Sequence, residues 1–309
     1  MKTAVDSGCC FWDGGAFYGP PSDPTANLTL IRRFFQRFPG YKSKVFLCVK
    51  GGSNMARYQE EGYRGLGPDM SENNLRNDLA AIRQALGSDQ DGHEVDMYAV
   101  ARVDHKYTIK EWMSTLVKLQ KEGLFTHICL SEVSSETVRV AAGIAPIAAV
   151  EVEYSLWETS VESNGVLAAC QELRIPLIAY SPIGKGILGG RLSSREQLVA
   201  GDNRLFHERY SEENFAANLE LARSLAAKAE QMKCTPAQLC LAWVLRQDPQ
   251  LVIALPGTTK VDNIKQNASA MSFELSDQED RDIRSLVSRM GVSGGRYNSA
   301  IRDRGILWG

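Results

Sequence analysis

The residues Phe11-Trp-Asp13-Gly-Gly-Ala-Phe-Tyr18-Gly19 end an apolar run with an acid and place a tyrosine five positions later in a glycine-rich loop. The next apolar run along the chain ends in Lys50-Gly-Gly. In a parallel α/β barrel, functional side chains lie at the carboxyl ends of the strands. If both runs are strands of such a barrel, Asp13, Tyr18 and Lys50 lie at one mouth, and we expect them to act together.

Short apolar runs rich in β-branched residues recur along the chain, with helical patterns between them. This alternation is typical of βαβ units that build a parallel sheet with both faces covered. Helix starts are marked by Thr108-Ile-Lys-Glu111, Thr235-Pro-Ala-Gln238 and Ser276-Asp-Gln-Glu279, the last of which begins a helix near 277–290. The expected strands are Cys9–Asp13, Val45–Lys50, Val95–Ala101, His127–Ser131, Ala148–Val152, Pro176–Ser181 and Leu251–Leu255.

Seven such units are one short of an eight-stranded (β/α) barrel, and an open doubly wound sheet rarely needs so many. Residues Met1–Gly8 are similar to the last turns of a helix that ends at glycine and runs straight into the first strand. We therefore expect an α/β fold of the TIM-barrel class, with the first strand and most of the first helix missing upstream of Met1. The polar segment Leu192–Glu213 is interpreted as a functional loop, so residues 1–309 are expected to form a single domain.

Composition excludes several classes of partner. Lys and Arg number 35 against 37 Asp and Glu, a net charge of −2, which argues against nucleic acid or a membrane surface as partner. The seven cysteines are odd in number and contain no C-x-x-C pair, so neither a disulfide framework nor a metal site is expected. The longest nearly apolar stretch, Val140–Val150, is too short to cross a bilayer. We expect a soluble cytoplasmic protein.

The strand-end residues define a specific chemistry. An ammonium beside a phenol favours the phenolate and lowers the pKa of the tyrosine, so Lys50 would make Tyr18 a general acid near neutral pH. A carboxylate at Asp13 would keep Lys50 protonated and aimed. Taken singly, each residue has a more common structural role. A tyrosine in a glycine-rich loop is more often a lid or packing residue, a strand-end aspartate often caps a helix or turn, and a strand-end lysine is usually solvated. The combination of the three at consecutive strand ends favours catalysis.

A second motif, Gly184-Lys-Gly186-Ile-Leu-Gly189, matches the G-x-G-x-x-G pattern of a dinucleotide-binding turn. That fingerprint belongs in the first βα turn of a dinucleotide domain, whereas this copy follows the sixth expected strand. Two interpretations remain open: a flexible turn, or a backbone cradle for a cofactor pyrophosphate.

A third motif lies where the last expected strand passes into a helix, in the segment Leu255–Asn267. Backbone N–H groups, the hydroxyls of Thr258 and Thr259, and Lys260 meet at the helix N-terminus, which suits a phosphate dianion. The alternative is a threonine-capped helix with a surface lysine.

Taken together, these elements resemble the aldo-keto reductases over nearly the whole chain. The resemblance implies a catalytic tetrad of Asp, Tyr, Lys and His, of which Asp13, Tyr18 and Lys50 supply three. Ala101, just before Arg-Val-Asp104, stands where the family has its histidine. The loss implies weaker positioning of the substrate carbonyl and more room for a bulky ring; His105 is expected to be an exposed loop residue.

The resemblance also implies the site for NADP (NADPH). Ser131 and Glu132 match the pair that holds the nicotinamide carboxamide, Glu151 replaces the usual glutamine, and Tyr180 matches the tyrosine that stacks on the nicotinamide. Each carboxylate can accept from the carboxamide NH₂ but, when ionised, cannot donate to its C=O. The usual arginine of the 2′-phosphate segment is Asn263, so NADP over NAD is supported by Lys260 and two hydroxyls. The remaining cofactor residues so implied are Ser181, Pro182, Ile183, Gly184, Gly186, Gly257, Thr258, Thr259, Gln266 and Asn267.

Within the family, the Ala101 substitution, the segment Leu130–Ser134 and the late Gly295-Arg-Tyr297 are similar to the fungal pyridoxal reductase branch. This implies NADPH-dependent reduction of a small aldehyde substrate, with pyridoxal to pyridoxine as the expected reaction, a step of vitamin B6 metabolism. Two alternatives remain: an NADPH-binding regulatory subunit like the potassium-channel β subunits of the family, or a truncated inactive reductase that lacks its first strand.

Overall fold

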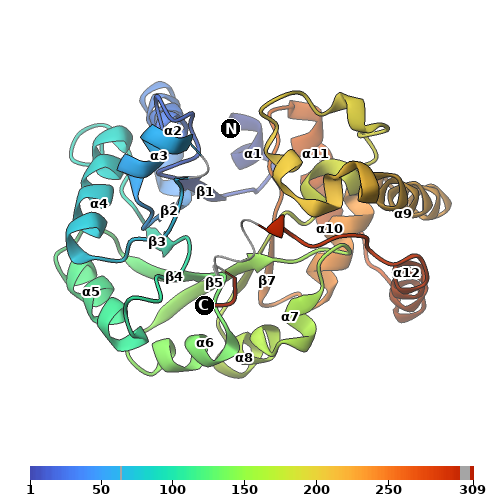
Figure 1. Ribbon diagram of the computed structural model, residues 1–309. Coiled ribbons are helices and arrows are strands. Elements are labelled where there is room, and N and C mark those ends of the chain that lie inside the picture. Colours follow the sequence, from blue (N-terminus) through green and yellow to red (C-terminus); the bar gives the residue numbers. More distant parts are fainter. Residues whose placement is uncertain (63–64, 300–306) are drawn as a thin grey trace. The chain divides into compact units, whose positions relative to one another are not determined.

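The structure is a computed structural model that describes residues 1–62, 65–299 and 307–309. Strands and helices alternate along the chain (Figure 1). Each of the seven strands in the described residues coincides with an expected one to within two residues at either end. The strands are β1 (Phe11–Gly15), β2 (Phe46–Gly51), β3 (Met97–Val100), β4 (His127–Ser131), β5 (Ile147–Glu153), β6 (Leu177–Tyr180) and β7 (Val252–Leu255).

The helices begin where the capping residues predicted them. Thr108, Thr235 and Ser276 each form a reciprocal capping box with the residue three positions later, so both orphan N–H groups are satisfied. The expected helix at the N-terminus is also present. The helices are α1 (Lys2–Asp6), α2 (Ala26–Arg37), α3 (Met55–Glu61), α4 (Glu72–Leu86), α5 (Ile109–Lys121), α6 (Ser135–Ala142), α7 (Ser160–Ser163), α8 (Val166–Leu173), α9 (Glu212–Gln231), α10 (Pro236–Arg246), α11 (Val261–Ser269) and α12 (Asp277–Met290).

The first of two compact units comprises residues 1–151, 168–175 and 307–309 of the described chain. In it β1 to β5 pair in parallel and in chain order. Helices α4, α5 and α6 lie along the outer side of β2 to β4 (Figure 1). The apolar faces of α4 and α5 are buried, with Leu75, Leu79, Trp112 and Leu116 at most 2% exposed, and this burial positions the strand ends.

The second unit comprises residues 152–167 and 176–299. Its strands β6 and β7 pair in parallel, and a short 3-10 helix, η3 (Gly184–Gly189), follows β6. The expected functional loop Leu192–Glu213 consists of short 3-10 segments before α9 begins at Glu212. Trp243 and Tyr210 are at most 1% exposed within this unit.

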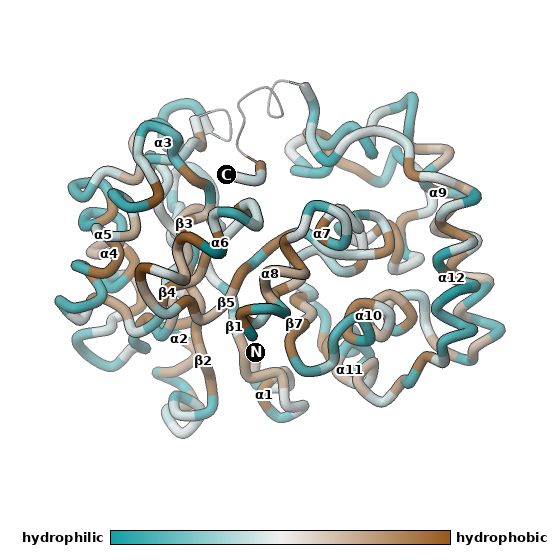
Figure 2. Tube along the Cα trace, turned by 90° about the horizontal axis from the view of Figure 1, so that it is seen from below, coloured by the Kyte–Doolittle hydropathy of each residue, from teal (hydrophilic) through white to brown (hydrophobic). Residues whose placement is uncertain are grey.

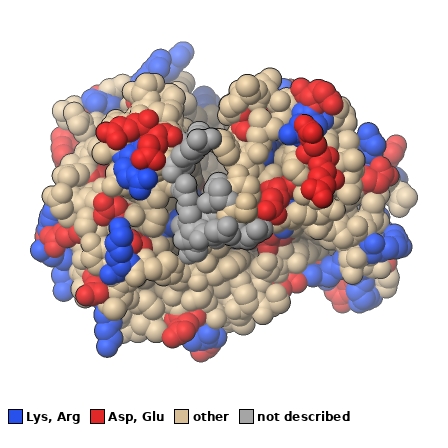
Figure 3. Space-filling view, viewed as in Figure 1, with Lys and Arg blue, Asp and Glu red and all other residues tan. Residues whose placement is uncertain are grey.

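The charged residues on the surface are of both signs, as the near-zero net charge of the sequence predicts. Figure 2 shows hydrophobic residues in β2 and β4 and hydrophilic turns on α12. Figure 3 shows acidic and basic side chains interspersed over the described part of the face viewed in Figure 1. Among the described residues, no helix is both long enough and apolar enough to cross a membrane. The single domain and the strand upstream of Met1 stay predictions.

Candidate active site and cofactor pocket

The carboxyl end of β1 carries the first catalytic candidate, Asp13, and is held by α2. The Asn27 side chain of α2 donates to the Gly15 carbonyl oxygen at 2.7 Å and accepts from the Gly15 N–H at 3.1 Å. In the β1–β2 register Gly15 lies opposite Lys50. The parallel pairing thus brings the acid and the lysine predicted from sequence to the same end of the sheet.

Lys50 is the centre of a buried charge cluster. Its Nζ lies 2.6 Å from Asp13 Oδ2 and 2.6 Å from Glu151 Oε1, and the three side chains are at most 7% exposed. Burial by itself would lower the pKa of Lys50, but Asp13 and Glu151 raise it well above its ordinary value. Lys50 therefore stays charged through the physiological pH range, as the sequence predicts.

Tyr18 joins this cluster at the Asp13 carboxylate. Its hydroxyl donates to Asp13 Oδ2 at 3.3 Å, and Lys50 Nζ lies 5.7 Å from the ring centroid. Although the residue as a whole is 47% exposed, its hydroxyl is turned toward the buried carboxylate.

The pKa of Tyr18 is raised, which corrects the expectation from sequence. Burial is the largest cause; Lys50 lowers the pKa as expected, but burial outweighs it and Asp13 raises the pKa further. In this structure the phenol is therefore fully protonated at neutral pH. The hydroxyl thus carries the proton that a general acid would donate, although the raised pKa makes it a weaker acid than an ordinary tyrosine.

The two glycines after Lys50 allow a close approach to a buried acid on α4. Asp78 Oδ2 accepts the Gly52 N–H at 2.8 Å and the Tyr98 hydroxyl at 2.7 Å. A Cβ atom at Gly51 would lie 1.9 Å from that oxygen, and Gly52 has a left-handed φ of +74°. Burial raises the pKa of Asp78 to about 6. The Gly-Gly pair thus fixes the end of the strand that presents Lys50.

The residues expected at the nicotinamide carboxamide lie together at the ends of β4 and β5. Ser131 lies opposite Glu151 in the parallel register, and the Glu132 N–H donates to the Glu151 carbonyl oxygen at 3.0 Å. Glu132 has a φ of 55° at the strand end, the left-handed region that non-glycine residues seldom adopt.

Several buried polar atoms of this cluster have no hydrogen-bond partner among the described residues. They are Ser131 Oγ, Asp13 Oδ1 and both carboxylate oxygens of Glu151, of which Oε1 also forms the ion pair with Lys50. Burial, followed by Asp13, raises the pKa of Glu151 to about 7. Orphaned buried groups of this kind are costly unless a ligand satisfies them.

The position of the missing histidine is filled by a small buried residue. Ala101 is 5% exposed, and its N–H donates to the Gly51 carbonyl oxygen at 2.9 Å. His105 is exposed, as expected. The sequence analysis did not single out Arg102, whose charge lowers the pKa of Glu151. The sequence signal that could have identified Arg102 was its position in the Arg-Val-Asp104 segment, directly after Ala101.

Two cysteines lie in the same interior. Cys48 Sγ, Cys129 Sγ and a carboxylate oxygen of Glu151 lie within 4.8 Å of one another, the kind of group that could hold a metal ion. The Lys50 ammonium is already 2.6 Å from Glu151 and supplies the positive charge that this carboxylate needs. We therefore assign no metal to the cluster.

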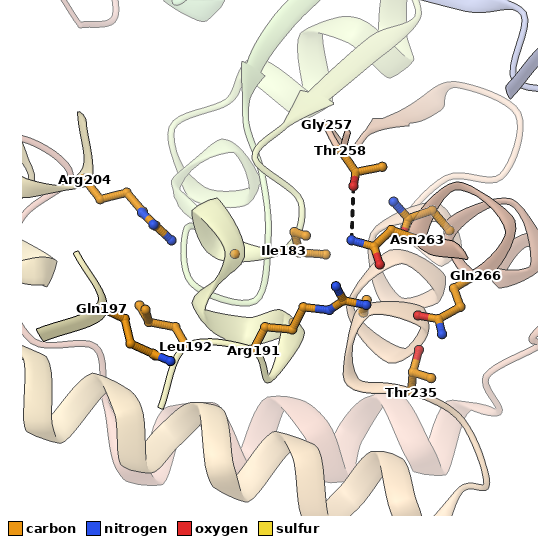
Figure 4. Close-up of a pocket in the computed structure, with 14 residues that line it drawn as sticks. Ile183, Arg191, Leu192, Gln197, Arg204, Thr235, Gly257, Thr258, Asn263 and Gln266 are labelled. Carbon is orange, nitrogen blue, oxygen red and sulfur yellow. Dashed lines mark hydrogen bonds between the residues drawn. The ribbon is translucent and has the colours of Figure 1, made fainter. Parts of the chain in front are cut away.

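The second unit contains a pocket of about 370 Å³ that collects many of the expected cofactor residues (Figure 4). Those in its wall are Ile183, Gly186, Gly257, Thr258, Asn263, Gln266 and Asn267. Residues that the sequence analysis did not assign complete the wall: Gly189, Arg191, Leu192, Gln197, Arg204, Thr235 and Ala237.

One wall of the pocket has an internal hydrogen bond and an unsatisfied acceptor. Asn263 Nδ2 donates to Thr258 Oγ1 at 3.0 Å (Figure 4), while Asn263 Oδ1 is buried and has no partner among the described residues. Thr259 and Lys260 are exposed and are not part of the wall. The cation expected from sequence is thus not the one that the structure brings to the pocket.

Two arginines, Arg191 and Arg204, lie in the pocket wall, to which Lys260 does not belong. Figure 4 shows the Arg191 side chain extending toward Asn263 and Gln266. Arg204 enters from the loop between β6 and α9 and pairs with Asp202 at 2.6 Å. Arg204 belongs to the segment Leu192–Glu213, whose composition indicated a functional loop but not which residues act, and Arg191 directly precedes that segment. The signal was present in the sequence as a basic residue directly after Gly189-Gly190.

The turn after β6 has the backbone of a tight, glycine-dependent bend. Ser181, Gly184, Lys185 and Gly186 all have left-handed φ, between 52° and 100°. Tyr210 donates its hydroxyl to the Gly184 carbonyl oxygen at 2.7 Å. Ile183 and Gly186 of this turn lie in the pocket wall, where a backbone cradle would need them, and Pro182 is buried.

Comparisons with known proteins match nearly the whole chain to one family. The sequence model of the Aldo/keto reductase family matches residues 1–288. A probable pyridoxal reductase 2 of Schizosaccharomyces pombe is 31% identical over 98% of this chain and 89% of its own length. An aldo-keto reductase of the same yeast, named for NADP(+), is 35% identical over 96% of this chain and 84% of its own length.

Among solved structures, the glycerol dehydrogenase of Gluconobacter oxydans superposes with a TM-score of 0.79. It is 20% identical, and the match covers 96% of this chain and 86% of that one. At this identity the likeness shows the fold alone: an α/β fold with parallel strands of the kind found in that enzyme.

Proposed function

Because the chain belongs to the aldo/keto reductase family of NAD(P)-dependent oxidoreductases, we propose that it reduces an aldehyde to a primary alcohol with NADPH, and that pyridoxal, converted to pyridoxine, is its substrate. The observation that carries the proposal is the buried Asp13–Lys50 pair with the Tyr18 hydroxyl on the same carboxylate. A solvated lysine or a packing tyrosine would not require this arrangement.

The residues of the first unit suit a nicotinamide. Ser131 Oγ and Glu151 Oε2 are buried without a hydrogen-bond partner among the described residues, and a carboxamide offers both donors and an acceptor. With a pKa near 7, Glu151 is protonated in part of the molecules, and in that form it can also donate to the carboxamide oxygen. At Glu151, this answers the difficulty that a carboxylate replaces an amide.

The pocket of the second unit suits an adenosine 2′-phosphate. Arg191 and Arg204 supply guanidinium groups, which bind phosphate in a forked geometry, and Asn263 Oδ1 offers a buried acceptor for an exocyclic amine. These residues support NADPH over NADH more strongly than Lys260 does. The proposal assigns one dinucleotide to both sets of residues, so the single-domain prediction is part of it.

When bound, the reduced nicotinamide supplies a hydride to the carbonyl carbon. Tyr18 gives its hydroxyl proton to the carbonyl oxygen, which completes the primary alcohol. The phenolate that remains is stabilised by Lys50, whose charge is maintained by Asp13 and Glu151. Ala101 is smaller than the histidine that the family has at this position, and the room that this difference implies for a bulky ring supports pyridoxal as the substrate.

NADPH oxidation by the purified protein across a panel of aldehydes that includes pyridoxal tests the proposal. We expect turnover with pyridoxal, and a loss of at least about a hundredfold in Tyr18→Phe, within the range by which general acids contribute. Full activity in Tyr18→Phe would contradict the mechanism. Faster turnover of other aldehydes by orders of magnitude would replace only the substrate, and bound NADPH without turnover would favour the regulatory-subunit alternative.

A further inference from the structure

The segment Ser293–Asn298, here called the tail segment, is held within the second unit by hydrogen bonds to its main chain. Asn218 accepts from the Ser293 N–H at 3.0 Å and donates to the Ser293 carbonyl oxygen at 2.8 Å. The Gly295 N–H donates to Glu208 at 2.8 Å, and the Asn298 N–H donates to the Phe206 carbonyl oxygen at 3.1 Å. These contacts hold the segment against the loop before α9.

The side chain of Arg296, within the tail segment, reaches the residue expected under the nicotinamide. Its Nη2 donates to the Tyr180 hydroxyl oxygen at 2.8 Å, and its Nε donates to Glu153 Oε2 at 3.0 Å. Arg296 is 8% exposed, whereas Tyr180 is only half-buried.

Glu153 links this contact to the turn after β6. It forms a second ion pair with Lys185, a residue of the turn that has a left-handed φ of 52°. Burial alone would raise the pKa of Glu153, but Lys185 and Arg296 lower it to about 2, so the carboxylate stays ionised at neutral pH. One buried anion thus joins the tail segment to the turn.

We propose that Arg296 is a positioning residue for the cofactor: by holding the Tyr180 hydroxyl it fixes the ring plane on which the nicotinamide stacks, and through Glu153 it steadies the turn at Lys185. This inference rests on the proposed function. A tyrosine ring held only at its Cβ rotates about two torsions, and ordering it during binding costs free energy. Arg296 meets that cost before the cofactor arrives.

The contacts separate this role from simple attachment of the tail segment. Asn218 and Glu208 bind main-chain atoms of the segment, so they remain in place when the Arg296 side chain is shortened. If Arg296 only attached the tail segment, its substitution would lower the stability of the protein and would not weaken binding of one half of the cofactor more than the other. A positioning role weakens binding of the nicotinamide half selectively.

The test compares two ligands by titration with the purified protein: NADPH, and adenosine 2′,5′-bisphosphate, which lacks the nicotinamide. We expect Arg296→Gln to weaken NADPH binding by about tenfold, equivalent to about 1.4 kcal/mol, and to leave the bisphosphate affinity within about twofold. Arg289→Gln, which removes an exposed arginine from the end of α12, is the matched control and should change neither affinity.

Tyr180→Phe keeps the ring and removes the hydroxyl that Arg296 holds. It should weaken NADPH binding selectively. Arg296→Gln should weaken NADPH binding much less when it is added to Tyr180→Phe than when it is introduced into the wild-type protein. If Arg296→Gln does not fold, Tyr180→Phe alone decides: unchanged NADPH affinity overturns the inference. Equal losses for both ligands also overturn it. Absence of NADPH binding by the wild-type protein would instead contradict the proposed function.

Discussion

Lys50 and Glu151 form a buried ion pair of 2.6 Å, although the family pattern places an uncharged amide where Glu151 stands. The lysine thus serves two carboxylates at once, because Asp13 lies equally close. The second carboxylate changes how stability and cofactor binding depend on pH.

Replacing Glu151 by Gln should flatten the pH dependence of stability. Burial raises the pKa of Glu151 in the folded protein from its ordinary value of 4.5 to about 7. The folded state therefore holds the proton more tightly than the unfolded state, and stability declines as the pH rises from about 4.5 to about 7. Thermal unfolding at several pH values should show this decline in the wild type and a weaker one in Glu151→Gln; parallel curves would contradict it.

Replacing Lys50 by Met should destabilise the protein as well as abolish reduction. The change leaves Asp13 and Glu151 buried without a counter-ion, and breaking a buried ion pair typically costs about 3–5 kcal/mol. Urea unfolding measures the loss. The double variant that also carries Glu151→Gln removes one of the stranded charges and should recover part of it; no recovery would argue that Glu151 is not a true partner of Lys50.

Replacing Gly51 by Ala should strain the strand that presents Lys50. Its Cβ would lie 1.9 Å from Asp78 Oδ2, so the buried acid must move from its contacts with Gly52 and Tyr98. We expect a loss of about 1–3 kcal/mol by chemical unfolding, as for other overpacked interiors. Gly40→Ala is the matched control, because nothing lies within 4 Å of its Cβ; equal losses would refute the steric argument.

Replacing Arg191 by Gln should reduce the preference for NADPH over NADH. The guanidinium lies in the pocket wall, whereas Lys260 lies outside it. Loss of a charge-assisted phosphate contact should weaken NADPH binding by about tenfold and NADH binding much less. Lys260→Gln should have the smaller effect, and Arg223→Gln on the exposed face of α9 should have none. A larger loss for Lys260→Gln would restore the expectation from sequence.

Local sequence patterns were sufficient for the elements and for part of the site. Helix starts were predicted by the capping boxes at Thr108, Thr235 and Ser276, and strands were predicted by the apolar runs. Both kinds of element depend on residues that are only a few positions apart in the chain. The strand-end argument also predicted that Asp13 and Lys50 meet, because parallel strands end at one edge. The resemblance then pointed to the residues of the pocket wall.

What the sequence by itself determined is therefore the alternation of strands and helices, the chemistry at the ends of β1 and β2, and the kind of cofactor to look for. Only the tertiary structure decided that the pKa of Tyr18 is raised, that Glu151 shares Lys50, and that Arg296 holds Tyr180, 116 positions away. The physical reason is that these properties depend on burial and on charges brought together by folding, and neither is a function of the neighbouring residues in the chain.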